Sequence, residues 1–296
     1  MKKDVLIYFI GKSTPAIANL VIIILGVRFL GTEQYGKYSL ILSGVILITN
    51  FSFTWIQQSM VRFLSAFKDH PSDSISRFFF LTIVSTLPGT IALILSCLFY
   101  YKLNLFEVFF VVLYSWTLIF FLFRQTVYQT LIRPVKYAIY EGVYNLLLFL
   151  IFIGFVFIIA WKNYLILFIS MGVSVIIAEV VHQIFFIEKS FRIDFFKIQW
   201  NKDFTKKAMD YGFTLTIWIF LFTVTTIADR YILKEFRDYS TLGTYSAIKD
   251  LVTKISTFAI LPIYLAFNAR INDTWNSGNE SGALRLVKKA LQLELL

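Results

Sequence analysis

The sequence predicts an all-α integral membrane protein. Hydrophobic residues make up 58% of the 296 residues, charged residues only 16%, and phenylalanine alone contributes 33. A single soluble core cannot bury so many apolar side chains, whereas lipid can. The apolar residues form continuous runs, not the alternating segments of about ten residues that a membrane β-barrel shows. The runs are therefore predicted to be helices, because only a helix satisfies its own backbone polar groups in lipid.

Eight runs reach the roughly 20 residues that a helix needs to cross a bilayer. The first could open a secretory signal peptide, but it is too long and no small-x-small cleavage pattern closes it, so we expect a retained span. The runs cover residues 5–30, 38–61, 78–101, 105–127, 137–160, 164–187, 211–233 and 242–267.

The distribution of basic residues predicts the orientation. The chain carries 28 Lys and Arg residues and a net charge of +10. With the N-terminus inside, eighteen of them fall on the inner side, seven on the outer side and three within spans. This bias indicates that both termini are cytoplasmic. The charge then reflects inner connections that meet anionic lipid headgroups, so membrane lipids are expected partners and nucleic acid is not.

The longest connection suggests a division of the chain. It is basic, carries four aromatic residues and is expected to lie on the inner membrane surface as an amphipathic segment. We therefore expect a first six-helix lobe at 1–187, a cytoplasmic linker at 188–210, and the start of a second lobe at 211–296, with two spans and a cytoplasmic segment.

After the eighth run we expect a polar loop, Asn268–Gly282, in which Ser277 and Glu280 resemble a capping box. An amphipathic helix from Leu284 to Leu296 follows. Because a second lobe like the first would need further spans, we expect this lobe to be incomplete, with its ninth span missing.

Two stretches on the outer side resemble each other. Arg28-Phe-Leu-Gly-Thr-Glu-Gln-Tyr-Gly-Lys-Tyr-Ser-Leu begins at the end of the first run, and Leu242-Gly-Thr-Tyr-Ser-Ala opens the eighth. Aligning Tyr38-Ser39 with Tyr245-Ser246 predicts that the chain is built from two related halves.

The spans that follow these stretches each carry a polar stripe with helical spacing. The alignment superimposes the two stripes, with Ser43 on Asp250 and Asn50 on Thr257. Such side chains either line a polar path or hold neighbouring helices together. The stripe of the second span is Ser39, Ser43, Asn50, Thr54 and Gln57, and that of the eighth is Ser246, Asp250, Thr253, Lys254 and Thr257, beside Lys249.

Further charged residues lie in other spans, where they usually face the bundle interior. Lys12 shares a face with Asn19 in the first span, and Asp229 and Arg230 end the seventh. The alternative for Lys12 is snorkelling to the inner headgroups, and for Asp229 and Arg230 a role as membrane-edge anchors.

Two spans carry carboxylates that could couple an ion. Glu141 lies with Asn145 in the fifth span, and Glu179 shares a face with His182 near the inner end of the sixth. A carboxylate beside a histidine can relay protons, and the alternative is a solvated pair at the membrane interface.

Enzyme signatures are absent from the sequence. It contains no Gly-x-x-x-x-Gly-Lys-Ser/Thr loop for ATP and no His-Glu-x-x-His zinc motif. A single cysteine, Cys97, and two histidines offer little for a disulfide or a metal site. We therefore expect a transporter with no cofactor and no metal, not an enzyme.

The paired motifs resemble those of a known family. Arg28-Phe-Leu-Gly-x-x-x-Tyr-Gly-x-Tyr-Ser-Leu, with Asp229-Arg-Tyr-Ile-Leu and Leu242-Gly-x-Tyr-Ser-Ala, is similar to Wzx-type polysaccharide flippases of the multidrug/oligosaccharidyl-lipid/polysaccharide exporter superfamily. The resemblance implies a MATE-like helical bundle of two six-helix lobes around a central cavity.

The resemblance also implies a function. Such a protein moves undecaprenyl-diphosphate-linked oligosaccharide across the bacterial inner membrane by alternating access, for surface polysaccharides such as the O-antigen of lipopolysaccharide. A polysaccharide polymerase complex is a possible partner. The alternatives are an ion-coupled multidrug or small-molecule antiporter of the same superfamily, or a non-catalytic membrane subunit. A polymerase or membrane glycosyltransferase is disfavoured, because the outer connections are only a few residues long.

The polar stripes assign residues to this function as hypotheses. A cationic site suits a diphosphate, and polar side chains suit sugar hydroxyls. Expected at the diphosphate site are Lys12, Arg230, Lys249 and Lys254, with Asp229 and Asp250 balancing charge or coupling an ion, and expected along the glycan path are Asn19, Asn50, Thr54 and Gln57.

Overall fold

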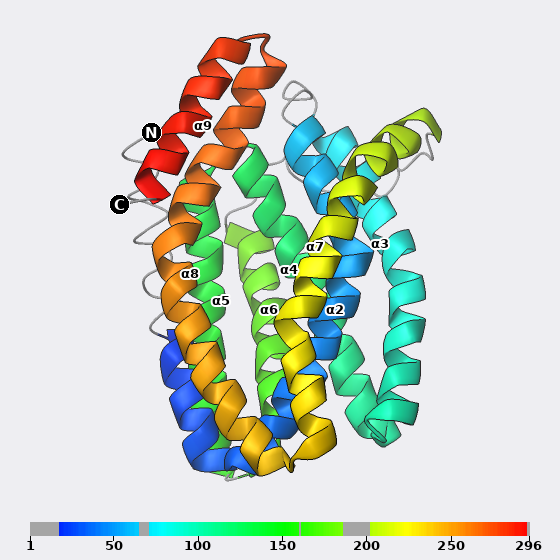
Figure 1. Ribbon diagram of the computed structural model, residues 1–296, viewed down its shortest axis with the longest axis vertical. Coiled ribbons are helices and arrows are strands. Elements are labelled where there is room, and N and C mark those ends of the chain that lie inside the picture. The colour runs from blue at the N-terminus through cyan, green and yellow to red at the C-terminus, as the bar shows by residue number, and fades with distance from the viewer. Residues whose placement is uncertain (1–17, 65–70, 160, 186–201, 295–296) are drawn as a thin grey trace.

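A computed structural model describes residues 18–64, 71–159, 161–185 and 202–294. All regular secondary structure in these ranges is helical, and the helices run along the long axis of an elongated bundle (Figure 1). The elements are the helix Ala18–Leu30, α2 (Thr32–Phe63), α3 (Pro71–Leu95) with the π-helical turn η2 (Ser96–Tyr100), α4 (Leu105–Thr130), α5 (Pro134–Gly154) with the π-helical turn η3 (Phe155–Ile159), α6 (Leu165–Phe185), α7 (Lys202–Phe236), α8 (Tyr239–Asn276) and α9 (Glu280–Glu294).

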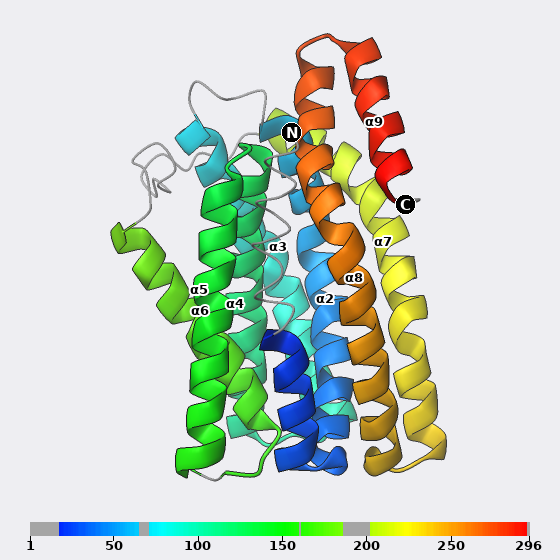
Figure 2. The ribbon, with the colours of Figure 1, turned by 90° about the vertical axis from the view of Figure 1, so that its left-hand side faces the viewer.

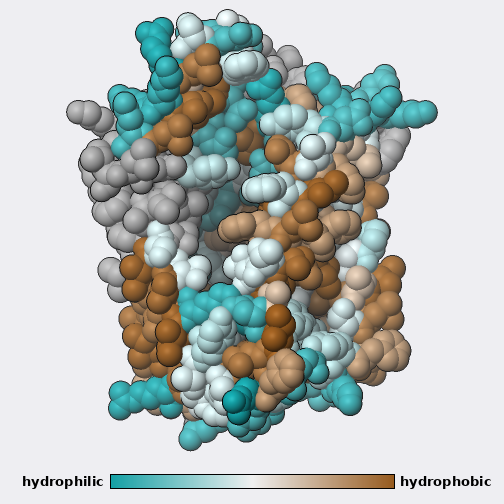
Figure 3. All heavy atoms as spheres, viewed as in Figure 1, coloured by the Kyte–Doolittle hydropathy of each residue, from teal (hydrophilic) through white to brown (hydrophobic). Residues whose placement is uncertain are grey.

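The bundle has the surface of a membrane protein. Six of the described helices, α2 to α7, are long and apolar enough to cross a membrane. In Figure 3, hydrophilic side chains gather at both ends of the long axis and hydrophobic ones lie between them. Near the middle of that face the surface is hollowed, and hydrophilic atoms interrupt the hydrophobic belt. The predicted all-α membrane fold is confirmed.

Local signals explain where several helices begin. Asn104 accepts a hydrogen bond from the backbone N–H of Glu107 (3.0 Å), and the Glu107 carboxylate accepts one from the backbone N–H of Asn104 (2.9 Å), a complete capping box for α4. Pro134 starts α5, where its missing N–H is not needed. Asp238 caps α8 by accepting from the backbone N–H of Thr241 (2.9 Å), and hydrogen bonds from Thr241 lower the pKa of Asp238.

Helix α2 is the central element of the bundle. It packs against α3 and α4 on one side and against α7 and α8 on the other, so that segments from both ends of the chain meet on it. Figure 2 shows α2 running between these helices. Its largest fully buried side chains are Tyr35, Phe53, Leu40, Ile56 and Met60. The interior is therefore organised around α2.

The two related stretches meet at the end of the bundle where α7 turns into α8. A Cβ atom on Gly36 would overlap the carbonyl oxygen of Tyr239, and one on Gly243 would overlap the carbonyl oxygen of Thr32. The alignment predicted from sequence pairs Gly36 with Gly243 and Thr32 with Tyr239. The contact is thus reciprocal, as at an interface between two-fold-related elements. Glycine is required on both sides because the backbones touch.

The structure corrects the end of the predicted second half. Residues 268–276, predicted as a loop, continue α8, and the side-chain amide of Asn272 donates to the backbone carbonyl of Asn268 one turn earlier (2.9 Å). The turn falls at Gly278, whose φ of 82° favours glycine. Ser277 does not cap α9, because its hydroxyl donates back to the carbonyl of Thr274 (2.8 Å). The prediction of a loop was wrong because these polar residues belong to a part of α8 that is exposed to water, and the backbone there is still helical.

Of the predicted linker at 188–210, residues 202–210 form the first turns of α7. The remainder, up to residue 201, lies outside the described residues. The division into lobes stays a prediction.

Candidate functional site

A cavity of about 520 Å³ lies in the interior, where the first half of the chain meets α7 and α8. The helix Ala18–Leu30 and α2, α4, α5, α6, α7 and α8 all contribute to its wall. Its polar and charged lining residues are Asn19, Tyr35, Tyr38, Asn50, Tyr114, Glu141, Tyr144, Asn145, Thr223, Thr226, Arg230, Lys249, Asp250, Thr253 and Lys254.

Arg230 connects the two halves in this wall. Its side chain comes from α7, is only 8% exposed, and forms an ion pair with Asp250 of α8. Its Nη1 also donates to the hydroxyl of Ser43 (3.0 Å) and to the backbone carbonyl of Ser39 (3.4 Å) on α2. Tyr35 donates to the second carboxylate oxygen of Asp250 (3.0 Å). The guanidinium is thus fixed by partners on both sides of the cavity.

A second ion pair lies beside the first. Lys249 of α8 pairs with Asp229 of α7 and also donates to the backbone carbonyl of Thr226. Tyr245 donates to the same Asp229 oxygen. The Asp229 and Lys249 side chains are 33% and 23% exposed, so this pair is more accessible than that of Arg230. In the first pair α7 supplies the cation and α8 the carboxylate, and in the second pair these roles are reversed.

Amides and hydroxyls line other parts of the cavity. Asn50 of α2 donates to the hydroxyl of Thr223 on α7 (3.0 Å). Asn19 donates to the side-chain oxygen of Asn145 on α5 (2.9 Å), and Asn145 donates to the backbone carbonyl of Glu141 (2.8 Å). These groups offer neutral donors and acceptors around the charged pairs.

The structure brings together most, but not all, of the residues predicted for the site. Lys254, Asn19, Asn50 and Glu141 line the cavity with Arg230, Lys249 and Asp250, and Asp229 joins them through Lys249. Thr54 and Gln57 are not among the lining residues. Thr54 is buried, and Gln57 donates to Thr126 of α4 (3.3 Å). Lys12 lies outside the described residues.

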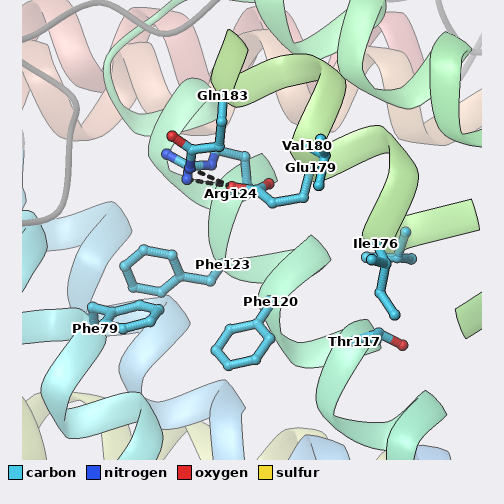
Figure 4. A pocket seen from close by; sticks show the side chains of 10 residues that line it. Phe79, Thr117, Phe120, Phe123, Arg124, Ile176, Glu179, Val180 and Gln183 are labelled. Atoms are coloured by element: carbon cyan, nitrogen blue, oxygen red, sulfur yellow. Dashed lines mark hydrogen bonds and ion pairs between the residues drawn. The ribbon is translucent and has the colours of Figure 1, made fainter. Parts of the chain in front are cut away.

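Glu179 and His182 belong to a different cluster. Glu179 of α6 forms an ion pair with Arg124 of α4 (2.6 Å) and accepts from Tyr140 (3.0 Å), while His182 Nε2 lies 2.7 Å from the hydroxyl of Tyr128. None of these residues lines the central cavity. Figure 4 shows the Arg124–Glu179 pair at one side of a separate pocket.

Several site residues were missed from the sequence. Tyr35 lies on α2 between the polar stripe and the helix start, and its role depends on Asp250 of α8. Arg124 was not singled out from the sequence, and the structure places it inside α4 with 3% exposure. Its position in an apolar run, four residues before Tyr128, could have predicted a buried ion pair, because a cation within a span usually has a partner.

The arrangement suits a charged and hydroxylated ligand. Arg230, Lys249 and Lys254 are matched by Asp250, Asp229 and Glu141, so the cations at the cavity are balanced by an equal number of carboxylates within the described residues. An anionic ligand can replace a carboxylate as the partner of a guanidinium or an ammonium group. In the described part of the chain no group of three His, Cys, Asp or Glu side chains could hold a metal ion.

Comparison with known proteins is consistent with this picture. A family described as polysaccharide biosynthesis protein matches residues 1–267. Comparison with curated protein sequences finds no match.

Solved structures with a similar fold are MATE transporters. A MATE protein in complex with Br-NRF has a TM-score of 0.67 at 13% identity, over 99% of this chain and 71% of its own. The Vibrio cholerae MATE transporter VcmN, in mutant form, has a TM-score of 0.65 at 11% identity, over 98% and 69%. An outward-facing multidrug resistance MATE transporter of the MOP superfamily has a TM-score of 0.67 at 12% identity, over 98% and 66%. The predicted MATE-like bundle is therefore confirmed as a fold.

Proposed function

Because the chain belongs to the polysaccharide biosynthesis protein family and has the MATE fold of the MOP superfamily, we propose that it moves a lipid-linked oligosaccharide across the membrane. The substrate class that fits best is an oligosaccharide joined by a diphosphate to undecaprenol, carried between leaflets of a bacterial inner membrane. The observation that carries the proposal is the buried Arg230, held between Asp250 and Ser43 in the wall of the central cavity.

Under this proposal, each part of the substrate has a counterpart in or beside the cavity. Diphosphate oxygens would replace the carboxylates of Asp250 and Asp229 as partners of Arg230 and Lys249, since a guanidinium pairs well with phosphate. Sugar hydroxyls would exchange hydrogen bonds with amides such as Asn50. The polyprenyl chain would stay in the surrounding lipid.

The carboxylates then have a defined role. While the cavity is empty, Asp229 and Asp250 keep the cations paired, which avoids an uncompensated charge inside the membrane. When the diphosphate takes their partners, these carboxylates become available for a proton or another cation. Exchange of partners at Arg230 and Lys249 would in this way link substrate binding to alternating access.

The test is complementation of a strain that lacks its lipid-linked oligosaccharide flippase. We expect the protein to restore surface polysaccharide and Arg230→Gln to abolish the restoration at equal membrane abundance. Arg237→Gln is the matched control, because Arg237 is an exposed arginine that follows α7 outside the cavity. Full export by Arg230→Gln, or failure of both variants alike, would contradict the proposed role of Arg230.

The balance of charges at the cavity also favours a second candidate, ion-coupled export of a small cationic molecule. Asp229, Asp250 and Glu141 could bind such a cation if Arg230 and Lys249 moved away. Proteoliposomes separate the two candidates. Substrate-specific transfer of a labelled diphosphate-linked oligosaccharide supports the first, and proton- or sodium-driven uptake of a cationic dye without such transfer supports the second.

A further inference from the structure

A second pocket, of about 550 Å³, lies between α3, α4 and α6. Three phenylalanines, Phe79, Phe120 and Phe123, form one side of it, and α6 forms the other (Figure 4). The volume falls within the range of small-molecule sites. None of its lining residues belongs to the central cavity, so it is a separate site.

The pocket opens on the flank of the bundle. Ile176 and Val180, on its α6 side, are 43% and 52% exposed, and both lie in a helix that can cross the membrane. Apolar side chains that are exposed in such a helix face lipid. The pocket is therefore accessible from the bilayer.

One end of the pocket is polar and contains a buried cation. Arg124 is 3% exposed, and its Nη2 pairs with Glu179 (2.6 Å). Its Nε and Nη1 have no hydrogen-bond partner among the described residues. Unpaired donors on a buried guanidinium are unfavourable, and an acceptor from outside the chain would satisfy them after a small side-chain shift.

The neighbouring carboxylate does not offset this preference for an anion. Glu179 already accepts from Arg124, from Gln183 (2.7 Å) and from Tyr140 (3.0 Å). The Glu179 carboxylate therefore satisfies only one of the donor groups of Arg124, because its other hydrogen bonds come from Gln183 and Tyr140. Two further cations lie at the same end of the bundle, Arg133 immediately before α5 and Lys136 in its first turn.

The polar and apolar ends are ordered along the membrane normal. Arg124 lies six residues before the end of α4, about 9 Å along the helix axis. Gln183 lies two residues before the end of α6, whereas Thr117, Phe120 and Ile176 lie deeper. A phospholipid has the same order, with its phosphate near the surface and its acyl chains below.

We propose that this pocket binds one anionic phospholipid. Its phosphate accepts hydrogen bonds from Arg124 at the α4–α5 end of the bundle, and an acyl chain lies against Phe79, Phe120 and Phe123. The bound lipid connects α3, α4 and α6 and does not take part in transport. This inference is independent of the function proposed for the central cavity.

Native mass spectrometry of the detergent-solubilised protein, titrated with phosphatidylglycerol, tests the proposal. We expect one tightly bound lipid, with phosphatidylcholine binding roughly tenfold more weakly. Ile176→Trp fills the pocket and should lower phosphatidylglycerol affinity by about tenfold. Ile177→Trp is the matched control, since Ile177 is a neighbouring exposed isoleucine (36%) that does not line the pocket, and it should bind like the unmodified protein.

Arg124→Lys keeps a cation beside Glu179 while removing the additional guanidinium donors, so it should weaken phosphatidylglycerol severalfold without unfolding the protein. Inorganic phosphate at millimolar concentration should not displace the lipid. Equal affinity of the Ile176→Trp and Ile177→Trp variants would overturn the site. Equal binding of phosphatidylcholine, or displacement by free phosphate, would overturn an anionic phospholipid as its ligand.

Discussion

Ser43 and Asp250, which the alignment of Tyr38-Ser39 with Tyr245-Ser246 makes equivalent, meet at the same guanidinium. Arg230 donates to the Ser43 hydroxyl through Nη1 and to the Asp250 carboxylate through Nη2. One arginine from α7 thus lies between Ser43 of the α2 stripe and Asp250 of the α8 stripe. Ser43 supplies a hydroxyl and Asp250 a charge, so the aligned positions differ in chemistry.

The two ion pairs of the cavity should differ in strength. Arg230 and Asp250 are 8% and 21% exposed, less than Lys249 and Asp229. Breaking a buried pair costs about 3–5 kcal/mol, whereas exposed pairs contribute roughly 0.2–1 kcal/mol. We expect Asp250→Asn to lower the free energy of unfolding by about 3 kcal/mol and Asp229→Asn by about 1 kcal/mol. Double-mutant cycles with Arg230→Gln and Lys249→Gln, measured by denaturation in detergent, check this order, and a reversed order would contradict it.

Where α2 and α8 cross, Gly36 and Gly243 should not tolerate replacement by a residue with a side chain. Gly36→Ala and Gly243→Ala would each place a methyl group against backbone, which typically destabilises by about 1–3 kcal/mol. We expect the melting temperature of both variants to fall and cysteine labels near the crossing to become more accessible. Gly142→Ala in α5 is the control, because nothing lies within 4 Å of a Cβ there, and helix propensity makes it neutral or stabilising. Unchanged melting of the Gly36 and Gly243 variants would show that the helices can separate.

Asn50 and Gln57 lie on one stripe of α2 and should differ in function. Asn50 lines the cavity and contacts Thr223, whereas Gln57 contacts Thr126 of α4. In the complementation assay, Asn50→Ala should reduce surface polysaccharide several-fold at equal abundance, and Gln57→Ala should leave it near the unmodified level. Equal loss in both variants would place the glycan path along the whole stripe, as the sequence predicted.

The start of α9 should depend on Asn279 and not on Ser277. The Asn279 side chain accepts from the backbone N–H of Gly282 (2.9 Å), as an N-cap does. Asn279→Ala should cost about 1 kcal/mol of local stability, seen as faster amide hydrogen exchange in the first turn of α9. Ser277→Ala should leave that exchange unchanged, and faster exchange in this variant would restore the capping box expected from sequence.

Much of the fold could be predicted from the sequence because lipid imposes simple rules. Continuous apolar runs give helices, and helical spacing puts Ser43 and Asn50 on one face of α2. The alignment of the paired motifs also matched Gly36 with Gly243, and the structure brings these two glycines into contact. The relation between the complete halves stays a prediction.

The role of each polar side chain in the site depends on which neighbouring helix it faces. The packing of helices against one another cannot be derived from a single sequence. Asn50 and Gln57 share a face, but α7 lies opposite the first and α4 opposite the second. The partner of Arg124, Glu179, lies 55 residues further along the chain, and the spacing of apolar residues does not show that the two meet. Helix α8 exceeded its predicted end because polar residues continue a helix once it leaves the membrane.

The charged clusters differ in how far apart their partners lie in the sequence, and this difference implies an order of assembly. The Arg124–Glu179 and Tyr128–His182 contacts join α4 to α6 and are available as soon as α6 has been synthesised. The hydrogen bond from Arg230 to Ser43 spans 187 residues and must wait for α7. Until then Ser39 and Ser43 of α2 lack the hydrogen bonds that Arg230 donates to them. The wall of the central cavity can therefore close only after α7 and α8 have been synthesised. A ribosome stalled before α7 would leave the pocket between α3, α4 and α6 complete and the central cavity open.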